Sequence, residues 1–195
     1  MSRLLIATTN SGKQREFRRL LAGLPAELVT PDEIGLDLDV DEPHDTYEEN
    51  AVAKAEAYAA ASGLPSLADD FGIEIATLDW GPGVRSARWG GGRNAERVLE
   101  ALGAEQDRRA RMVCVVAVAR PAGESLEVHA FRGVVEGTVA TEMRGDGGFG
   151  YDPIFLLPEG RTTAELPEAE KDALSHRGRA VAAATPMLLE LLAAD

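Results

Sequence analysis

Cysteine and positive charge are scarce in this chain, and long apolar runs are missing from it. The single cysteine, Cys114, cannot form an internal disulfide, and within the apolar run 112–119 we expect it to be a small buried side chain. Basic residues number 20 against 33 acidic ones, and the net charge of −13 argues against a general nucleic-acid binder or an anionic membrane partner. A polyphosphate ligand stays compatible with this charge, because a few local cations and a divalent metal outweigh a distant negative surface.

No apolar run approaches the roughly 20 residues that cross a bilayer. The N-terminal stretch Leu4–Ala7 is also too short for the apolar region of a signal peptide. A composition of 45% hydrophobic and 27% charged residues is typical of a globular protein, and 195 residues can bury an ordinary core. We therefore expect one domain over residues 1–195, with no membrane segment and a cytoplasmic location.

The order of the expected elements favours a mixed α/β fold. Apolar patterning predicts strands over residues 3–9, 28–29, 66–69, 73–78, 110–119, 126–132 and 134–140. Helices are predicted over residues 13–21, 46–62, 94–102 and 176–192. Residues 31–45 and 80–92 are predicted to be irregular. Helices at both ends with antiparallel hairpins between them argue against a simple doubly wound sheet.

The stretch "ATTNSGKQ" (7–14) resembles a phosphate-binding P-loop without matching it, since Ala7 replaces the first glycine and Gln14 the final Ser or Thr. A strand that ends at a helix N-terminus leaves backbone N–H groups free for an anion, and the helix dipole adds positive potential there. Lys13 adds a full charge. The alternative is that Asn10 or Ser11 only caps the helix and that Lys13 is solvated.

Carboxylates form the second candidate group. Asp69 and Asp70 are costly if buried without partners, and they make sense if they hold a metal or act as a base; otherwise they lie in a solvated turn. Strand alternation places them on opposite faces. Glu49 fits a capping box with Thr46, whereas Glu42 lies in the preceding loop with no evident structural role.

Two motifs in the last third of the chain are typical of ligand contacts. In "GGFGYDP" (147–153), glycines allow a close backbone approach and Phe149 offers a stacking face, although a hairpin turn with a core Phe is the alternative. In "EKDALSHRG" (170–178), Ser175 is a natural helix N-cap. His176 and Arg177 are then expected in an exposed first turn, where basic residues oppose the helix dipole and suggest a functional role.

Six short motifs in one order make the chain resemble the noncanonical purine nucleoside triphosphate pyrophosphatases, the inosine/xanthosine triphosphate diphosphatase (ITPase) family. They are T-x-N-x-x-K (8–13), E-N-A-x-x-K-A (49–55), A-D-D-x-G (68–72), P-G-x-x-S-A-R (82–88), G-G-F-G-Y-D-P (147–153) and E-K-x-x-x-S-H-R (170–177). The resemblance covers nearly the whole chain. It implies a two-lobed α/β fold around a long mixed central sheet, with the active site in the cleft between the lobes, and a homodimer.

The resemblance also implies a reaction and a set of site residues. The expected reaction is hydrolysis of ITP, dITP or XTP to the monophosphate and pyrophosphate, with Mg2+ as cofactor. Asp70 would be the general base, and Glu42 and Asp70 the metal ligands. The triphosphate would contact Thr8, Thr9, Asn10, Ser11, Gly12, Lys13 and Lys54. The base side of the site would comprise Phe71, Phe149, Gly150, Tyr151, Asp152, Lys171, His176 and Arg177.

Phe71 is a departure from the family pattern, which usually reads A-D-D-S-G and has a hydroxyl at this position. An altered substrate preference therefore stays open. The first alternative is a related nucleotide pyrophosphatase with a different base preference. The second is a nucleotide-binding protein without turnover, against which the presence of Asp70, Glu42, Lys13 and Lys54 argues.

Overall fold

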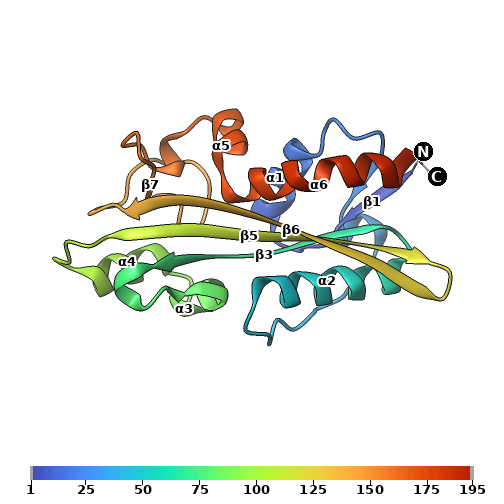
Figure 1. Cartoon of the computed structure of the whole chain (residues 1–195), viewed down its shortest axis with the longest axis horizontal. Coiled ribbons are helices and arrows are strands. Elements are labelled where there is room, and N and C mark those ends of the chain that lie inside the picture. Colours follow the sequence, from blue (N-terminus) through green and yellow to red (C-terminus); the bar gives the residue numbers. More distant parts are fainter. Residues whose placement is uncertain (1, 194–195) are drawn as a thin grey trace. The chain divides into compact units, whose positions relative to one another are not determined.

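A computed structural model describes residues 2–193, and the chain forms two compact units. Unit 1 comprises Met1–Asp70, Val115–Gly133 and Arg179–Asp195. Unit 2 comprises Phe71–Cys114 and Val134–Gly178. The strands follow the order β2-β1-β3-β5-β6-β7, and β4 pairs with β3 (Figure 1). Parallel and antiparallel pairs both occur, so the prediction of a mixed α/β fold with a mixed central sheet is confirmed.

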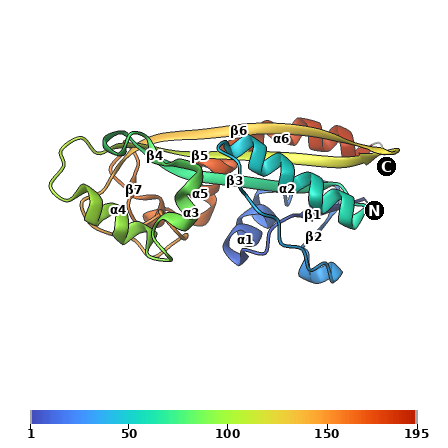
Figure 2. The same ribbon diagram turned by 90° about the horizontal axis from the view of Figure 1, so that it is seen from below.

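Unit 1 begins with a parallel β-α-β arrangement. Its elements are β1 (Arg3–Ile6), α1 (Ser11–Leu20), β2 (Glu27–Val29), the short helix η1 (Asp32–Ile34) and α2 (Tyr47–Ser62). Parts of β3 (Ser66–Ile75), β5 (Arg109–Ala122), β6 (Ser125–Val139) and α6 (His176–Ala193) complete it. Strand β1 pairs in parallel with both β2 and β3, and Figures 1 and 2 show α2 and α6 on opposite sides of the strands of this unit.

Burial on both faces explains the apolar runs of unit 1. Leu4, Leu5 and Ile6 of β1 have no exposed surface. Cys114, which lies in β5 directly before the part of that strand in unit 1, is buried as expected. A strand covered on both faces needs a continuous apolar run rather than alternation. Helix α2 begins at the predicted capping residue Thr46, whose hydroxyl accepts a hydrogen bond from the Glu49 N–H at 3.2 Å. It ends at Gly63, whose φ of 69° suits glycine.

Unit 2 contains the helices α3 (Ser86–Trp89), α4 (Asn94–Leu102) and α5 (Glu168–Leu174) (Figures 1 and 2). Its remaining elements are β4 (Gly81–Pro82), β7 (Phe155–Leu156) and the short helices η2 (Ala76–Leu78), η3 (Gly83–Arg85) and η4 (Thr163–Glu165). An apolar cluster that includes Ile73, Val98, Ile154 and Phe155 forms its core.

Three local predictions were wrong. Asp70, Phe71 and Gly72 lie inside one continuous strand, β3, rather than in a turn between two strands. Likewise, β6 passes through Gly133 without a break, so the two strands expected over 126–140 are one. Residues 80–92 contain β4, η3 and α3 instead of an irregular loop. In each case tertiary pairing overrode the local turn preference of Gly, Asp or Pro.

Other predictions agree with the structure. Helix α4 has the predicted bounds, α6 begins at His176 as expected, and β2 is one residue longer than predicted. Within residues 2–193, no helix combines the length and apolar character needed to cross a membrane. A single domain of two lobes over residues 1–195 stays a prediction.

Candidate active site

The start of α1 presents an exposed group of polar residues and backbone amides. Asn10 is the N-cap, and its side chain accepts a hydrogen bond from the Lys13 N–H at 3.0 Å. The Thr8 hydroxyl accepts from the Asn10 N–H at 3.2 Å. Thr9, Asn10 and Ser11 are exposed, whereas Gly12 is buried. The capping prediction for Asn10 is therefore confirmed, and the helix N-terminus remains open to an anion.

Lys13 is buried rather than solvated, and it meets a second buried lysine at Asp69. Its Nζ donates to Asp69 Oδ1 at 2.9 Å, and Lys54 Nζ from α2 donates to the Asp69 backbone carbonyl at 2.9 Å. Lys54 also forms an ion pair with Glu42 from the loop before α2. Burial by itself would lower the pKa of Lys54, but the negative charges of Asp69 and Glu42 outweigh it and raise that pKa. Lys54 thus stays charged.

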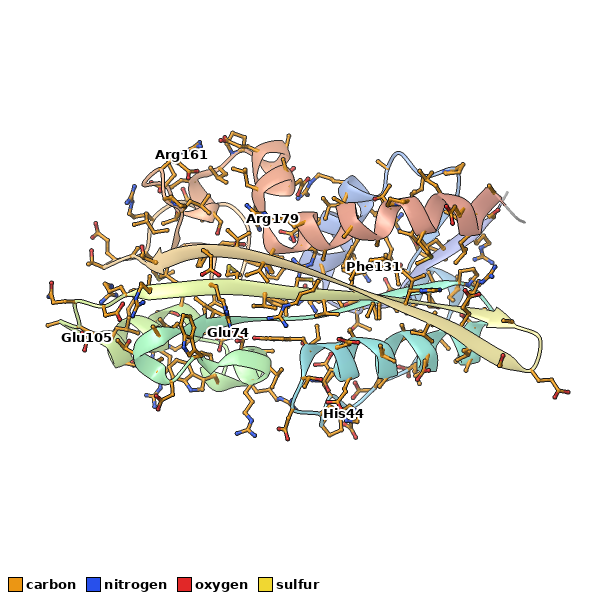
Figure 3. All side chains as sticks on the ribbon, in the orientation of Figure 1. His44, Glu74, Glu105, Phe131, Arg161 and Arg179 are labelled. Carbon is orange, nitrogen blue, oxygen red and sulfur yellow. The ribbon has the colours of Figure 1, made fainter. Side chains whose placement is uncertain are left out.

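Asp70, the next residue of β3, has a different environment. Asn50 Nδ2 donates to Asp70 Oδ2 at 3.0 Å. Asn50 Oδ1 accepts from the N–H of His44, a residue of the loop before α2 that is labelled in Figure 3. Burial raises the pKa of Asp70 to about 6; the charge of Glu42 adds to this rise, and the hydrogen bond from Asn50 opposes it. Asp70 is therefore a buried carboxylate that can take up a proton near neutral pH.

The carboxylates of unit 1 fit a magnesium ion shared with phosphate. Glu42 and Asp70 are close enough for the charge of one to raise the pKa of the other, and both offer hard oxygen ligands. Residues 2–193 contain no group of three or more His, Cys, Asp or Glu side chains placed to hold a metal. Magnesium in phosphate-transfer sites commonly uses one or two carboxylates and completes its coordination with phosphate oxygens and water. The pair is suited to that arrangement.

Asp152 organises the second group of predicted residues, in unit 2. Its Oδ2 accepts from the Phe149 N–H at 2.6 Å and from Lys171 Nζ at 2.7 Å, and its Oδ1 accepts from the Thr163 hydroxyl at 2.8 Å. Gly148 has a φ of 69°, and any Cβ there would collide with the Asp152 carboxylate. The glycine is therefore needed to let the loop close over Asp152, and this closure orients Phe149.

Aromatic rings and cationic side chains gather around Phe149. The Lys171 Nζ lies 5.3 Å from the centroid of the Phe149 ring, and the Arg177 Cζ lies 5.6 Å from it. Phe71 meets the same ring in a T-shaped contact with a centroid distance of 6.3 Å. Phe149 is half-buried, so the ring retains exposed surface, in contrast to a core phenylalanine. Cations near an aromatic face favour binding of an electron-rich flat ligand alongside.

The first turn of α6 is buried, which contradicts the prediction that it is exposed. His176 is 4% exposed and Arg177 1%. Helix α5 ends at Ser175, whose hydroxyl accepts from the Gly178 N–H at 3.0 Å. Because α6 begins immediately after α5, its first turn packs inside unit 2 instead of facing water. The predicted cap at Ser175 is confirmed, and the basic residues there contact rings rather than solvent.

The predicted site residues therefore form two groups. Unit 1 holds Thr8, Thr9, Asn10, Ser11, Gly12, Lys13, Glu42, Lys54 and Asp70. Unit 2 holds Phe71, Phe149, Gly150, Tyr151, Asp152, Lys171, His176 and Arg177. Tyr151 is buried and its hydroxyl donates to the Ser86 carbonyl at 2.7 Å, while Gly150 is exposed. Burial and this hydrogen bond give Tyr151 a packing role in unit 2.

Two supporting residues were absent from the predicted site. Asn50 holds the Asp70 carboxylate, and Ser86 accepts a hydrogen bond from the Ile73 N–H at 2.9 Å as well as the Tyr151 hydroxyl on its carbonyl. Both lie within motifs that were noted in the sequence. An asparagine one turn into a helix, with its cap already provided by Thr46, was the available signal for Asn50.

Comparisons with known proteins show the family of the chain. The sequence model of the Ham1 family matches residues 4–187. The dITP/XTP pyrophosphatase of Symbiobacterium thermophilum is 48% identical over 97% of this chain and 96% of its own length. A Ham1 protein structure from Coxiella burnetii has a TM-score of 0.83 at 39% identity and covers 100% of both chains. The dITP/XTP pyrophosphatase structure from Mycobacterium abscessus has a TM-score of 0.70 at 40% identity, covering 95% of this chain and 99% of that one. With its motifs, fold and full-length similarity in agreement, the chain belongs to the Ham1 family.

Proposed function

We propose that this chain is a pyrophosphatase that hydrolyses the noncanonical purine nucleotides ITP, dITP and XTP to the monophosphate and pyrophosphate. Membership of the Ham1 family and the similarity to proteins named dITP/XTP pyrophosphatase support the reaction. One structural observation supports it most directly. In unit 1 a buried carboxylate, Asp70, with its pKa raised to about 6, accompanies two buried lysines and an exposed helix N-terminus.

The triphosphate would bind where positive charge is already fixed. The backbone amides at the start of α1 and the hydroxyls of Thr8, Thr9 and Ser11 would hydrogen-bond phosphate oxygens. Lys13 and Lys54 would neutralise charge that builds up on the departing pyrophosphate. Both lysines are held by Asp69, so little reorganisation is needed when substrate arrives. This group binds phosphate without the glycine and hydroxyl that a P-loop uses.

Asp70 would act as the general base. A water molecule attacks the α-phosphorus and gives its proton to the Asp70 carboxylate; the bond to the bridging oxygen then breaks, and pyrophosphate leaves with the electron pair. Asn50 keeps the carboxylate oriented during this step. Glu42 and Asp70 would hold magnesium, which when bound neutralises phosphate charge and makes water easier to deprotonate. No covalent intermediate is needed.

The base would bind at the group in unit 2. Phe149 would stack on the purine, while Lys171, His176 and Arg177 would donate hydrogen bonds to the 6-keto oxygen and N7. Adenine has an amino donor at position 6, so buried donors would be left facing another donor, a costly mismatch. Asp70 and Phe71 are consecutive residues of β3. Asp70 belongs to the residues that would act on the triphosphate, and Phe71 to those that would bind the base.

We further propose magnesium dependence, a homodimer and a cytoplasmic location. The oxygen ligands of Glu42 and Asp70 support the first. The family resemblance supports the second, and a sedimentation mass of twice one chain is expected, whereas a single-chain mass would contradict it. A lone buried cysteine suits a reducing compartment and supports the third; a fluorescent fusion localised outside the cytoplasm would contradict it.

Product analysis tests the proposed reaction. Wild-type protein is incubated with XTP and Mg2+, and the nucleotides are separated by ion-exchange chromatography. We expect XMP and pyrophosphate in equal amounts. Accumulation of XDP and inorganic phosphate would mean attack at the γ-phosphorus and would contradict the proposal. A parallel reaction with a chelator in place of Mg2+ is expected to give no product, and undiminished turnover there would remove the metal from the mechanism.

A further inference from the structure

Phe71 is the centre of a packed group that we call the Phe71 cluster: Phe71, Phe149, Lys171, His176 and Arg177, all in unit 2. The Phe71 ring centroid lies 6.3 Å from that of Phe149, with the rings at 82°, and 5.7 Å from that of His176. The Arg177 Cζ lies 4.9 Å from the Phe71 centroid, closer than it lies to Phe149. Phe71 thus contacts three of the four other members.

These contacts constrain Phe149 and Arg177, two of the residues that would bind the base. An edge-to-face contact fixes the plane of one ring relative to another, so Phe71 limits the rotation of Phe149. A guanidinium over an aromatic face is attracted by the ring quadrupole, most strongly where water is excluded. Arg177 is almost fully buried, so its contact with Phe71 is of this stronger kind. Asp152 holds the backbone of Phe149, while Phe71, Lys171 and Arg177 contact its ring.

We infer that Phe71 is a specificity-determining positioning residue, whose ring holds Phe149 and Arg177 in the arrangement that accepts a 6-oxopurine base. This inference rests on the proposed function. Phe71 has no hydrogen-bonding group, so it acts through the orientation of its neighbours and not by reading the base edge. Phe71 follows Asp70, the proposed general base, in strand β3.

Three substitutions distinguish the effect of the aromatic ring from the effect of side-chain volume. Phe71→Ser removes the ring, Phe71→Leu keeps apolar volume without a quadrupole, and Phe71→Tyr keeps both. We expect Phe71→Ser and Phe71→Leu to raise KM for XTP about tenfold, the factor that loss of one cation–π contact of 1.4 kcal/mol gives. The preference for XTP over ATP, as a ratio of kcat/KM, is expected to fall by a similar factor. Phe71→Tyr should restore both to within about threefold.

Phe131 offers a matched control. It is a half-buried phenylalanine on the long strand β6, in unit 1, and Figure 3 labels it. Phe131→Ser removes the same side chain at similar exposure, so a loss of stability alone will appear in both variants. We expect Phe131→Ser to change the XTP-to-ATP ratio by less than about twofold, since surface substitutions away from a site have small effects. Melting temperatures of all variants are measured alongside.

The outcomes distinguish this inference from the proposed function. If wild-type protein fails to hydrolyse XTP, the proposed function fails and the inference with it. If wild-type protein is active and Phe71→Leu keeps its KM and selectivity, Phe71 acts as apolar filling and the inference alone is overturned. The same holds if Phe71→Ser lowers only the melting temperature. The inference is supported if Phe71→Ser and Phe71→Leu raise KM and lose selectivity while Phe71→Tyr recovers both.

Discussion

Asp69 and Asp70 are adjacent, chemically identical and both buried, yet their partners differ. Asp69 is paired with Lys13 through its side chain and receives Lys54 on its carbonyl. Asp70 has a neutral partner, Asn50, and lies near the like charge of Glu42. A buried carboxylate in direct contact with a cation is stabilised in its charged form. At Asp70 burial outweighs the hydrogen bond from Asn50 and the charges of Lys13 and Lys54, so the pKa is raised. The same substitution is therefore expected to have opposite consequences at the two positions.

Substitution of Asp70 by Asn is expected to abolish turnover of XTP while nucleotide binding stays measurable, because the amide cannot take the proton of the attacking water. It should also stabilise the metal-free protein at pH 7.5 by about 1 to 3 kcal/mol, since it removes a buried charge and keeps an oxygen for Asn50. Steady-state kinetics, calorimetric nucleotide binding and urea unfolding measure these effects. Full activity in the variant would remove Asp70 from its role.

The stability gained in Asp70→Asn should depend on pH. The folded-state pKa of Asp70 is raised to about 6, above its ordinary value of 3.8, so the folded protein binds the proton more tightly than the unfolded chain. Its contribution to stability is complete below about pH 4 and is lost as the pH rises through 6. The two metal-free proteins should thus unfold at similar urea concentrations at pH 4 and differ at pH 7.5. A difference that does not vary with pH would contradict the assigned shift.

Substitution of Asp69 by Asn is expected to destabilise the protein by about 3 kcal/mol at pH 7.5, because it leaves the buried ammonium of Lys13 without its counter-charge. Urea unfolding measured beside Asp70→Asn tests this. The two variants differ by one position in the chain and share the same chemistry, so each is the control for the other. Equal stability of the two variants would refute the different roles given to these aspartates.

At the scale of elements, the junction between α5 and α6 determines where His176 and Arg177 lie. Helix α6 can start directly after α5 because Gly178 packs closely under the carbonyl of Asp172, and Ser175 caps the new helix. A Cβ at position 178 would collide with that carbonyl. Backbone atoms cannot move aside as side chains do, so the junction requires glycine.

Gly178→Ala is therefore expected to cost about 2 kcal/mol or more in the free energy of unfolding, and to raise KM for XTP by displacing Arg177. Gly23→Ala is the matched control, since a Cβ at Gly23 meets nothing within 4 Å and its backbone has no positive φ. That change should be neutral or slightly stabilising. Thermal unfolding and steady-state kinetics measure both variants, and equal stability of the two would contradict this account of the junction.

The elements that sequence patterning predicts well are those in which local preference and tertiary packing agree. Helix α2 has a clear capping signal, helices α2 and α4 both end at a glycine, and apolar β1 and β5 are buried on both faces. Strand β3 was broken at Asp70 in the prediction because paired acidic residues disfavour strands. Lys13, Lys54 and Asn50, distant in sequence, compensate those charges, and single-sequence reasoning could not place them there.

In the candidate site, too, some features could be predicted from local motifs and others depend on tertiary contacts. Motif positions pointed to Lys13, Lys54 and Asp70, and the structure brings these residues together in unit 1. Burial of the first turn of α6 was not predictable from its basic residues, because it depends on Gly178 and the helix before it. The contacts of Phe71 with His176 and Arg177 join residues about a hundred positions apart, and no local pattern indicates them.

At the scale of the whole molecule, this strongly acidic protein has a few buried cationic side chains, and they belong to the candidate site. The net charge of −13 disfavours contact with nucleic acid, while Lys13, Lys54, Lys171 and Arg177 are all buried among carboxylates or aromatic rings. Their contacts hold these side chains in place before a ligand binds. A small polyanion with a flat base suits this distribution better than an extended polyanion does.

The central claim is that this chain selects deaminated purine nucleotides and releases pyrophosphate from them. Its most direct test is the rate of pyrophosphate release from XTP, ITP, ATP and GTP, each below its KM and with excess Mg2+. We predict that kcat/KM for XTP and ITP exceeds that for ATP and GTP by about 100-fold or more. For ATP the reason is that buried hydrogen-bond donors matched to a 6-keto oxygen face the 6-amino donor of adenine. Guanine has the same 6-keto oxygen, so rejection of GTP must involve its 2-amino group. Equal rates for all four nucleotides, or no release from any, would contradict the claim.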